Sequence, residues 1–540
     1  MNLQSKSFFA LLASLSLASA LGCTAQTESS NATPLGKSKA HLDARPGHGL
    51  PPIRAGKYPA GQGTPQHGGG TGSGSWTPQA NVPAQIAAGF SLLLTDGSVM
   101  VQDLSVLGGD WWKLTPDAAG SYVKGTWTQL ASMPNGYAPL YFASAVLPDG
   151  RVIIMGGEYQ AFQSTWTNQG AIYDPATDQW TPVAPPAGWQ TIGDAQSAVL
   201  PDGRFVMANC CSTEMAILDP VTLTWTATGT GKADTYFDEE GWTLLPNGDL
   251  LTVDSNDLAD LMHAETFHPA TGLWSSAGST VVKLADVNAD GSGSWELGSA
   301  MLRPDGTVFA AGALGQNAIY DTKKKTWTAG PSFPILDGEG QLDQADGPAA
   351  LLPNGNVLLG VSAGLFNAPA HFYEFDGKNL VAVATPASAT VDSSYNINLL
   401  VLPSGEILET DFSADVEIYA PLGRAKGSWR PDFEGCGLER LHAGHTYSLS
   451  GEQLHGLSQA VAYGDDAQAA TNYPIVRITN RATGHVAFAR THGFSSYSIA
   501  PHAHSTASFD VPAGIETGAS DLVVIANGIA SESIRTYISK

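Results

Sequence analysis

Charge is scarce in this chain, and positive charge is scarcer than negative. Asp, Glu, Lys and Arg make up only 14% of the 540 residues, and 50 acidic against 26 basic residues give a formal net charge of −24. Nucleic acids and anionic lipid surfaces bind basic protein surfaces. The composition therefore argues against nucleic acid as a partner and against electrostatic binding to a membrane. Solubility outside the cell is a sufficient explanation of the acidity.

Long hydrophobic runs are also scarce, and the one that stands out lies at the N-terminus. Lys6 supplies a positive charge, and residues 8–17 form an apolar stretch that is too short for a comfortable transmembrane helix. We predict a secretory signal peptide over residues 1–22. Further along, no segment is long and apolar enough to span a bilayer, so we expect an anchored or soluble protein outside the cytoplasm.

The signal ends in Ala20-Leu21-Gly22-Cys23, which resembles a bacterial lipobox. In such a sequence the cysteine is lipidated and becomes the first residue of the mature protein. We therefore predict lipidation at Cys23 and a place in the bacterial cell envelope. Ordinary cleavage after Ala18-Ser19-Ala20, which would give a secreted protein, is the alternative.

Glycine, by contrast, is abundant at 60 residues, and much of it lies in a repeated turn. Seven turn sequences stand about 45 to 58 residues apart, each between two β-rich runs. Gly and Asn tolerate the positive φ that tight turns need, so each turn indicates a β-hairpin. The spacing is the period of kelch-type propeller blades. The turns are Thr95-Asp96-Gly97, Pro148-Asp149-Gly150, Pro201-Asp202-Gly203, Pro246-Asn247-Gly248, Pro304-Asp305-Gly306, Pro353-Asn354-Gly355 and Pro403-Ser404-Gly405.

A second pattern follows several of the hairpins, in which an Asp-Pro or His-Pro type of turn precedes a tryptophan. Residues 173–180 are one example, and residues 218–225, 267–274 and 320–327 repeat it. We expect these tryptophans to pack between neighbouring blades rather than to bind sugars.

Cysteine is rare, with four residues in the whole chain. Besides the predicted lipidation site these are Cys210, Cys211 and Cys436, an odd number. The adjacent pair could close a vicinal disulfide, or one member could reach Cys436, since exported proteins can hold disulfides. The favoured interpretation is two buried thiols at a strand end, because Asn209-Cys210-Cys211 occupies the place that Met155-Gly156-Gly157 has one repeat earlier.

The repeats divide the chain into four parts. Residues 23–74 are rich in Gly, Pro, Ser and Thr and predict a flexible tether after the signal peptide of residues 1–22. Residues 75–427 predict a seven-bladed kelch-type β-propeller, whose last blade takes its outer strand from residues 75–78. Residues 428–540 contain short alternating strands and predict an immunoglobulin-like (early-set) β-sandwich. The fold class is therefore all-β.

Equivalent positions of the seven repeats can be compared near the start of each innermost strand, at the mouth of the predicted central channel. Eight residues before the middle of each turn stand Ala88, Tyr141, Asp194, Glu239, Leu297, Asp346 and Asn396. Glu296 and Tyr395 directly precede two of them. Such an accumulation of acids predicts a polar mouth for a metal ion, a cationic group or sugar hydroxyls. The alternative is the ordinary wet end of a propeller channel.

Over roughly residues 75–540 the chain resembles the copper radical oxidases, galactose oxidase and glyoxal oxidase, in which kelch-type blades precede a sandwich. The resemblance implies copper held by two tyrosines and two histidines, with one tyrosine cross-linked to a cysteine. By this resemblance Tyr141 corresponds to the radical tyrosine and Tyr159 to the aromatic that stacks on it. Ala88 stands at the site of the cross-linking cysteine, so the thioether is absent.

The same resemblance places the second tyrosine and the first histidine at Tyr395 and Asn396, and the second histidine at His492 within Thr491-His492. Asn396 is a poor substitute for the imidazole that copper prefers. The implied copper site is therefore degenerate, and fold alone does not carry activity.

These observations predict an extracytoplasmic lipoprotein that binds a small molecule, a carbohydrate or an envelope component without catalysis, and that works as a monomer. The alternative is an oxidoreductase for alcohols, aldehydes or sugars, with copper or another metal as cofactor. The residues expected at the ligand-binding mouth or metal site are Tyr141, Tyr159, Asp194, Glu239, Glu296, Asp346, Tyr395, Asn396 and His492.

Overall fold

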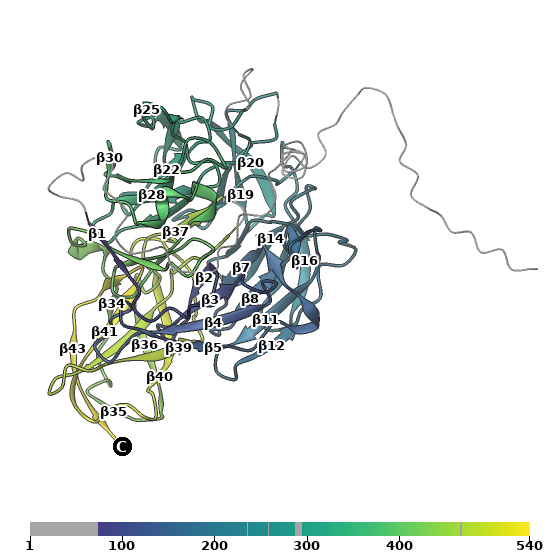
Figure 1. Cartoon of the computed structure of the whole chain (residues 1–540). Coiled ribbons are helices and arrows are strands. Elements are labelled where there is room, and N and C mark those ends of the chain that lie inside the picture. The colour runs from purple at the N-terminus through teal and green to yellow at the C-terminus, as the bar shows by residue number, and fades with distance from the viewer. Residues whose placement is uncertain (1–73, 235, 258, 287–293, 465–466) are drawn as a thin grey trace, which may run out of the picture. The chain divides into compact units, whose positions relative to one another are not determined.

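The computed structural model describes residues 74–540 apart from residues 235, 258, 287–293 and 465–466 (Figure 1). The predicted signal peptide of residues 1–22, Cys23 and the predicted tether lie outside the described residues. The described chain consists of strands joined by turns, with four 3-10 helices of three residues each and no α-helix. None of these described helices has the length and hydrophobicity that crossing a membrane requires. The protein is thus nearly all-β, as the sequence predicted.

Seven small antiparallel sheets contain most strands of the described chain before residue 421. Six have four strands and one has five, and within each sheet strands that follow one another in sequence lie side by side. The first four sheets are β2 (Ala88–Leu93), β3 (Val99–Asp103), β4 (Asp110–Thr115) and β5 (Thr126–Gln129); β7 (Ala143–Val146), β8 (Val152–Met155), β11 (Gly170–Asp174) and β12 (Gln179–Pro182); β13 (Ser197–Val199), β14 (Phe205–Ala208), β15 (Met215–Asp219) and β16 (Thr224–Thr228); and β17 (Thr243–Leu244), β18 (Leu250–Val253), β19 (His263–His268) and β20 (Leu273–Ser279).

The remaining three sheets continue the pattern. They are β21 (Ala300–Leu302), β22 (Thr307–Ala311), β23 (Asn317–Asp321) and β24 (Thr326–Ala329); β27 (Pro348–Leu351), β28 (Val357–Val361), β29 (His371–Phe375) and β30 (Leu380–Ala382), extended by β37 (Val461–Tyr463); and β31 (Asn398–Val401), β32 (Ile407–Thr410), β33 (Glu417–Ala420) and β1 (Ser75–Pro78). Two smaller sheets join β6 (Pro139–Leu140), β9 (Tyr159–Gln160) and β10 (Gln163–Ser164), and β25 (Ile335–Leu336) and β26 (Gly340–Gln341).

The predicted turns join the first strand of each sheet to the second. Their seven glycines have φ between +76° and +88°, a region that glycine enters without steric cost. In the second sheet, for example, Gly150 N donates to Leu147 O over 2.9 Å. The prediction of seven hairpins is confirmed.

The last sheet takes its fourth strand from the start of the described chain, as predicted. Strand β1 pairs antiparallel with β33, so that Trp76 lies opposite Tyr419. The Trp76 indole donates to Ala384 O over 2.7 Å. The edge of the seventh sheet is therefore covered by a segment from the other end of the chain.

The repeated tryptophans connect successive sheets. Trp180 donates to Ala131 O over 2.9 Å, and its ring centroid lies 6.0 Å from that of Trp111 in the preceding sheet. Trp225 donates to Ala184 O just after β12, and Trp327 donates to Ala277 O in β20, so each bonds to the preceding sheet or the segment that leaves it. This confirms the prediction that they pack between neighbours.

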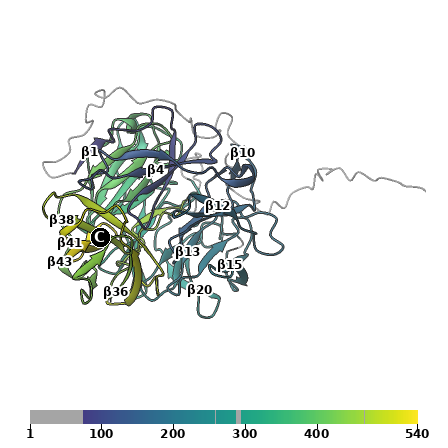
Figure 2. The same ribbon diagram turned by 90° about the horizontal axis from the view of Figure 1, so that it is seen from below.

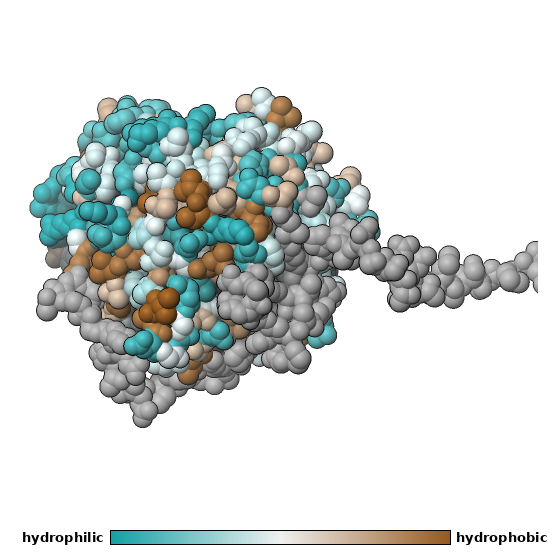
Figure 3. All heavy atoms as spheres, turned by 90° about the horizontal axis from the view of Figure 1, so that it is seen from above, coloured by the Kyte–Doolittle hydropathy of each residue, from teal (hydrophilic) through white to brown (hydrophobic). Residues whose placement is uncertain are grey.

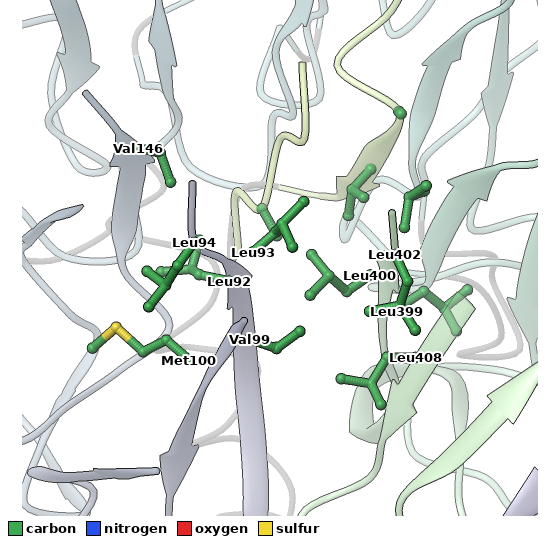
Figure 4. Packing of buried hydrophobic residues seen from close by; sticks show 14 of the residues in the cluster. Leu92, Leu93, Leu94, Val99, Met100, Val146, Leu399, Leu400, Leu402 and Leu408 are labelled. Carbon is green, nitrogen blue, oxygen red and sulfur yellow. The ribbon is translucent and has the colours of Figure 1, made fainter. Parts of the chain in front are cut away.

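Apolar residues of the first strands form the core between sheets. Figure 4 shows Leu93 of the first sheet pointing toward Leu400 of the seventh, whereas Leu92 and Leu94 lie on the side of Met100 and Val146. These leucines are almost fully buried. Burial of leucine side chains contributes roughly 1.5–3 kcal/mol each. The first and seventh sheets therefore pack directly against each other.

Most strands from Asp432 onward form a separate nine-stranded sheet, of which β36, β38, β41 and β43 are labelled in Figure 2. Its strands pair antiparallel except for β35 and β43, which run parallel. Along the path they are β34 (Asp432–Phe433), β36 (Thr446–Glu452), β40 (His504–Asp510), β39 (Val486–His492), β38 (Ile475–Asn480), β41 (Gly518–Ala526), β43 (Ile534–Ser539) and β35 (Arg440–His442), with β42 (Ile529–Ala530) beside β41. The finer assignment as an immunoglobulin-like sandwich stays a prediction.

One segment of this C-terminal part runs against the seven small sheets, and we call its described residues, 458–464 and 467–473, the crossing segment. Its strand β37 pairs with β27 of the sixth sheet. Ser144 and Ser197, on the first strands of the second and third sheets, donate to Gln468 over 2.6 and 2.9 Å. Because it bonds to first strands, the crossing segment lies where those strands come together.

The crossing segment also reaches the remaining four sheets. Gln459 Oε1 accepts a hydrogen bond from Leu244 N of the fourth, and Ala462 O accepts one from Ser299 of the fifth. The Tyr473 hydroxyl donates to Leu93 O of the first sheet. The Tyr463 hydroxyl donates to the carbonyl of Tyr395, which precedes β31 of the seventh. Polar groups along this segment thus find partners in the first strands or at their entrances.

A buried lysine fixes the loop that enters the fourth sheet. Lys232 Nζ lies 2.7 Å from Asp254, 3.1 Å from Glu240 and 3.3 Å from Glu265, and its side chain is 1% exposed. Burial raises the pKa of Asp254 to about 6, although Lys232 acts in the opposite direction. Burial would lower the pKa of Lys232, but the surrounding carboxylates hold it above its usual value. One cation therefore compensates several buried acids.

We expect Lys232→Met to destabilise the fold by about 3–5 kcal/mol at pH 8, because it leaves buried carboxylates without their cation. The loss should shrink towards pH 5, because acids whose folded pKa is raised bind protons on folding and gain stability as pH falls. Urea unfolding at both pH values measures this. Lys323→Met, which removes an exposed lysine, is the control. An equal loss at both pH values would contradict the electrostatic origin.

A buried histidine anchors the crossing segment. His455 Nδ1 donates to Asn472 O over 2.8 Å, and its ring packs against Phe494 and Tyr497. Burial lowers the pKa of His455 to about 4, because a second buried N–H would have no acceptor among the described residues. His455 is therefore neutral in the folded protein at neutral pH.

We expect this histidine to make the fold less stable in acid. Its folded pKa lies below its unfolded value near 6.5, so its contribution is complete above pH 6.5 and is lost as pH falls towards 4, by up to roughly 3 kcal/mol. His455→Asn should reduce this acid-induced loss relative to the wild type in urea unfolding from pH 8 to 4. His445→Asn, at an exposed site, is the control. Parallel pH profiles for wild type and His455→Asn would refute the assignment.

Candidate functional site

Three of the four acids predicted at the mouth lie together in the structure. A carboxylate oxygen from each of Glu239, Glu296 and Asp346 lies within 4.8 Å of the other two. The three residues are only 3%, 6% and 8% exposed. They lie in the segments that lead into the first strands of the fourth, fifth and sixth sheets. We call these three residues the acidic cluster.

The backbone at two of these positions is in the left-handed region. Glu239 has φ +64° and Asp346 has φ +43°, and Tyr141, the equivalent residue of the second sheet, has φ +55°. Non-glycine residues in this region cost about 1–3 kcal/mol each and persist only where the surrounding structure requires them. The entrance to the first strand is thus built in the same unusual way in three sheets.

Asp346 is a buried member of the acidic cluster with a raised pKa. Burial, followed by the negative charge of Asp238, raises its pKa to about 7. Its Oδ1 is buried and has no hydrogen-bond partner among the described residues. Carboxylates crowded in this way favour either a bound proton or a bound cation.

The crossing segment reaches the acidic cluster. A Cβ added to Gly464 would lie 3.5 Å from Asp346 Oδ1, and one added to Gly241 would lie 2.7 Å from the carbonyl oxygen of Gly464. The C-terminal part of the chain therefore contributes backbone to this end of the sheets. No local sequence pattern indicates this contact.

The fourth predicted acid, Asp194, is 2% exposed but does not belong to the acidic cluster. It follows Gly193, where an added Cβ would meet Cys210 Sγ at 2.4 Å. The comparison of repeats did not identify Asp238, which lies between the acidic cluster and the cysteines. Besides burial, its negative charge raises the pKa of Asp346. One of its carboxylate oxygens lies within 4.8 Å of both cysteine sulfurs. In the sequence, the run of three acids Asp238-Glu239-Glu240 could have indicated Asp238 as a further site residue.

The cysteine interpretation needs correction. Cys210 and Cys211 form a vicinal disulfide, so the favoured expectation of two buried thiols was wrong. Cys436 is free and exposed. Strand β14 ends at Ala208, and the adjacent cysteines then lie in a loop that lets their sulfurs meet, which the strand-end comparison did not anticipate.

The tyrosines implied by the oxidase resemblance lie in separate apolar surroundings. Tyr141 packs edge to face with Tyr159, with ring centroids 6.2 Å apart. Tyr395 packs against Phe366 at 4.9 Å, in a cluster that includes Ala345. The expected Tyr141–Tyr159 neighbourhood is present, but the two proposed ligand tyrosines belong to different clusters.

The residues corresponding to the two histidines also depart from a copper site. Asn396 Oδ1 accepts a hydrogen bond from Ser393 N within a short turn. His492 Nε2 lies 3.2 Å from Asp510, and the preceding Thr491 N donates to Thr95 O. Thr95 stands in the turn that follows β2, whereas the channel-mouth position of that sheet, Ala88, begins the strand. His492 is therefore at the opposite end of the first strands.

The residues present do not fit a copper radical centre. Ala88 has no sulfur, Asn396 offers an amide already used within its turn, and His492 is separated from the mouth by the length of a strand. The expected metal set of Tyr141, Tyr395, Asn396 and His492 is not assembled.

A cavity lies away from the acidic cluster, between the fourth and fifth sheets. Its volume is about 700 Å³, and none of the predicted mouth residues lines it. His268 in its wall lies 3.0 Å from Asp249 and 2.7 Å from Ser275. Tyr320, Leu457 and Ile499 contribute apolar surface. This cavity is large enough for a small organic ligand.

Exposed apolar residues are scattered. The most exposed large ones among the described residues, Val221 and Ile335, belong to different sheets. On the face drawn in Figure 3, apolar residues form small groups with polar residues between them. Such scatter is normal for a protein surface and marks no docking site.

Comparison with known proteins identifies the repeat. The family model described as "Kelch motif" matches residues 139–187, which span the whole second sheet. The Kelch-like protein terF of Aspergillus terreus is 30% identical over 129 residues, 23% of this chain and 26% of that protein. The match thus spans about a quarter of this relative.

Solved structures resemble the chain only at low identity. A streptogramin B lyase structure is 8% identical with a TM-score of 0.43, and the match covers 65% of this chain and 98% of that one. The extracellular domain of a putative one-component system from B. thetaiotaomicron is 11% identical with a TM-score of 0.43, covering 70% and 46%. The motif and the curated relative together support a kelch repeat in this chain, which lies in the second sheet.

Proposed function

We propose that this kelch-repeat protein is a ligand-binding propeller that binds a divalent cation at the acidic cluster. In this proposal the seven small sheets are the blades, the crossing segment runs along their common axis, and residues 428–540 form an immunoglobulin-like domain that supplies that segment. The contacts of the crossing segment with all seven sheets support this arrangement.

One observation carries the proposal, namely three carboxylates from three successive sheets within 4.8 Å of one another. Buried carboxylates repel each other and are stabilised by a cation or by protons. Oxygen-only donors suit Ca²⁺ or Mn²⁺ better than copper. Because each acid is less than a tenth exposed, the site suits an ion rather than a sugar ring.

The cellular setting is part of the proposal. The signal over residues 1–22 and lipidation at Cys23 would hold the protein at the outer side of a bacterial membrane as a monomer. The net charge of −24 supports a partner other than nucleic acid. An exported site also meets the millimolar Ca²⁺ concentrations that weak extracellular sites use.

We expect chelator-treated protein to bind one Ca²⁺ or Mn²⁺ in isothermal titration calorimetry. Glu239→Gln, Glu296→Gln and Asp346→Asn should each weaken binding about tenfold or more, because affinity follows the number of charged ligands. Ligand binding should also raise the unfolding temperature of the wild type and not of the triple variant.

Glu434→Gln, which removes one exposed carboxylate from the C-terminal part, is the matched control and should bind like the wild type. Circular dichroism would verify that each variant is folded. Unchanged binding in the folded triple variant, or no binding in the wild type, would contradict the proposal.

A second candidate function, carbohydrate binding, is favoured by the cavity of about 700 Å³ between the fourth and fifth sheets. Its polar groups can bind hydroxyls, and Tyr320 with Ile499 offers apolar surface to a sugar face.

For this cavity we expect saturation-transfer NMR with neutral mono- and disaccharides to give a signal in the wild type. His268→Ala should weaken the interaction about tenfold, because it removes a polar group from the wall, whereas Glu239→Gln should leave it intact. A glycan panel that gives no signal would reject carbohydrate binding in this cavity without affecting the cation proposal.

The residues do not favour the alternative of a copper oxidoreductase. Asn396 accepts a hydrogen bond within its own turn, His492 lies beside Asp510, and Ala88 stands where the cross-linking cysteine is expected.

A further inference from the structure

The vicinal disulfide lies in the wall of the proposed mouth. Cys210 N donates to Ile192 O over 3.0 Å, two residues before Asp194. Cys210 O accepts from Phe237 N over 3.0 Å, one residue before Asp238. The cysteine pair is therefore held between two loops, one of which contains Asp194 and the other Asp238.

The structure around the sulfurs is specialised for them. Gly193, with φ +75°, leaves the space that Cys210 Sγ occupies, since a Cβ there would come within 2.4 Å. Cys210 is fully buried, whereas Cys211 is half-buried. Cys211 is therefore the side from which a small thiol reductant would approach the bond.

A carboxylate oxygen of Asp238 lies within 4.8 Å of both sulfurs. Its backbone is fixed, because its carbonyl accepts hydrogen bonds from Ser255 and Asn256. Two thiolates and one carboxylate form a ligand set that suits Zn²⁺, with water as a fourth ligand. The sulfurs of a disulfide are poor ligands, so the same three residues bind metal only after reduction.

We propose that Cys210, Cys211 and Asp238 form a redox-gated site for Zn²⁺, closed as the disulfide and open as the dithiol. A dithiol reductant gives two electrons and two protons to the S–S bond, which breaks into two thiols while the reductant closes its own disulfide. Zn²⁺ then displaces two protons as the thiols bind as thiolates. In a tetrahedral site the sulfurs stand roughly 3.8 Å apart, which side-chain rotation can provide.

The test uses the full chain with Cys23→Ser, compared before and after reduction and removal of the reductant under anaerobic conditions. Elemental analysis should find one Zn²⁺ per reduced chain and none per oxidised chain. Co²⁺ in place of Zn²⁺ should give a thiolate-to-metal absorption band only after reduction. Calorimetric titration of Zn²⁺ into the reduced protein, in buffers of different ionisation enthalpy, should show release of about two protons per Zn²⁺ bound.

Variants separate this site from other thiols and from the acidic cluster. The double variant Cys210→Ser/Cys211→Ser should lose Zn²⁺ binding, and Asp238→Asn should weaken it about tenfold or more. Cys436→Ser, which removes the exposed free thiol, is the matched control and should bind as before. Asp346→Asn should also bind Zn²⁺ when reduced, whatever its effect on Ca²⁺.

Three results would overturn the proposal. These are equal Zn²⁺ binding by the oxidised chain, binding retained in the folded double cysteine variant, and no Zn²⁺ on a chain whose thiol count shows complete reduction. Failure of Ca²⁺ binding at the acidic cluster would leave this outcome unchanged, because the two sites use different ligands.

Discussion

The contact of one C-terminal segment with the first strands of seven sheets is the interaction on which the other features depend. The crossing segment pairs with β27 and accepts hydrogen bonds from Ser144, Ser197 and Ser299. Four-stranded sheets have little core of their own and are stabilised by their neighbours. A segment that satisfies polar groups on these first strands holds their ends close together, and the acidic cluster lies there.

Concentrating acids at one end of the sheets carries an electrostatic cost, and the molecule offsets it locally. Lys232 holds Glu240, and therefore the loop with Asp238 and Glu239, against the fourth sheet. Burial raises the pKa of Asp346, and the negative charge of Asp238 adds to the shift, so repulsion between these acids remains. A cation at the acidic cluster would remove that repulsion, so binding and local stability are coupled.

The sequence predicted features that depend on local pattern. Turn glycines, the tryptophans between successive sheets and the last strand β1 follow from spacing and periodicity, and comparison of equivalent positions identified Glu239, Glu296 and Asp346. The sequence did not predict long-range partners. Gly464 and Asp346, which lie close together in the structure, are more than a hundred positions apart in the chain. The prediction that His492 lies at the mouth was wrong, because the short motif Thr491-His492 does not indicate which end of the first strands it approaches.

The most direct measurement is a crystal structure of the full chain grown with Mn²⁺ at neutral pH, with anomalous diffraction recorded at the manganese edge. The account predicts one strong anomalous peak between the carboxylates of Glu239, Glu296 and Asp346, beside Gly464 of the crossing segment. Well-ordered carboxylates without a peak, or three carboxylates that point apart with the crossing segment away from the first strands, would contradict it.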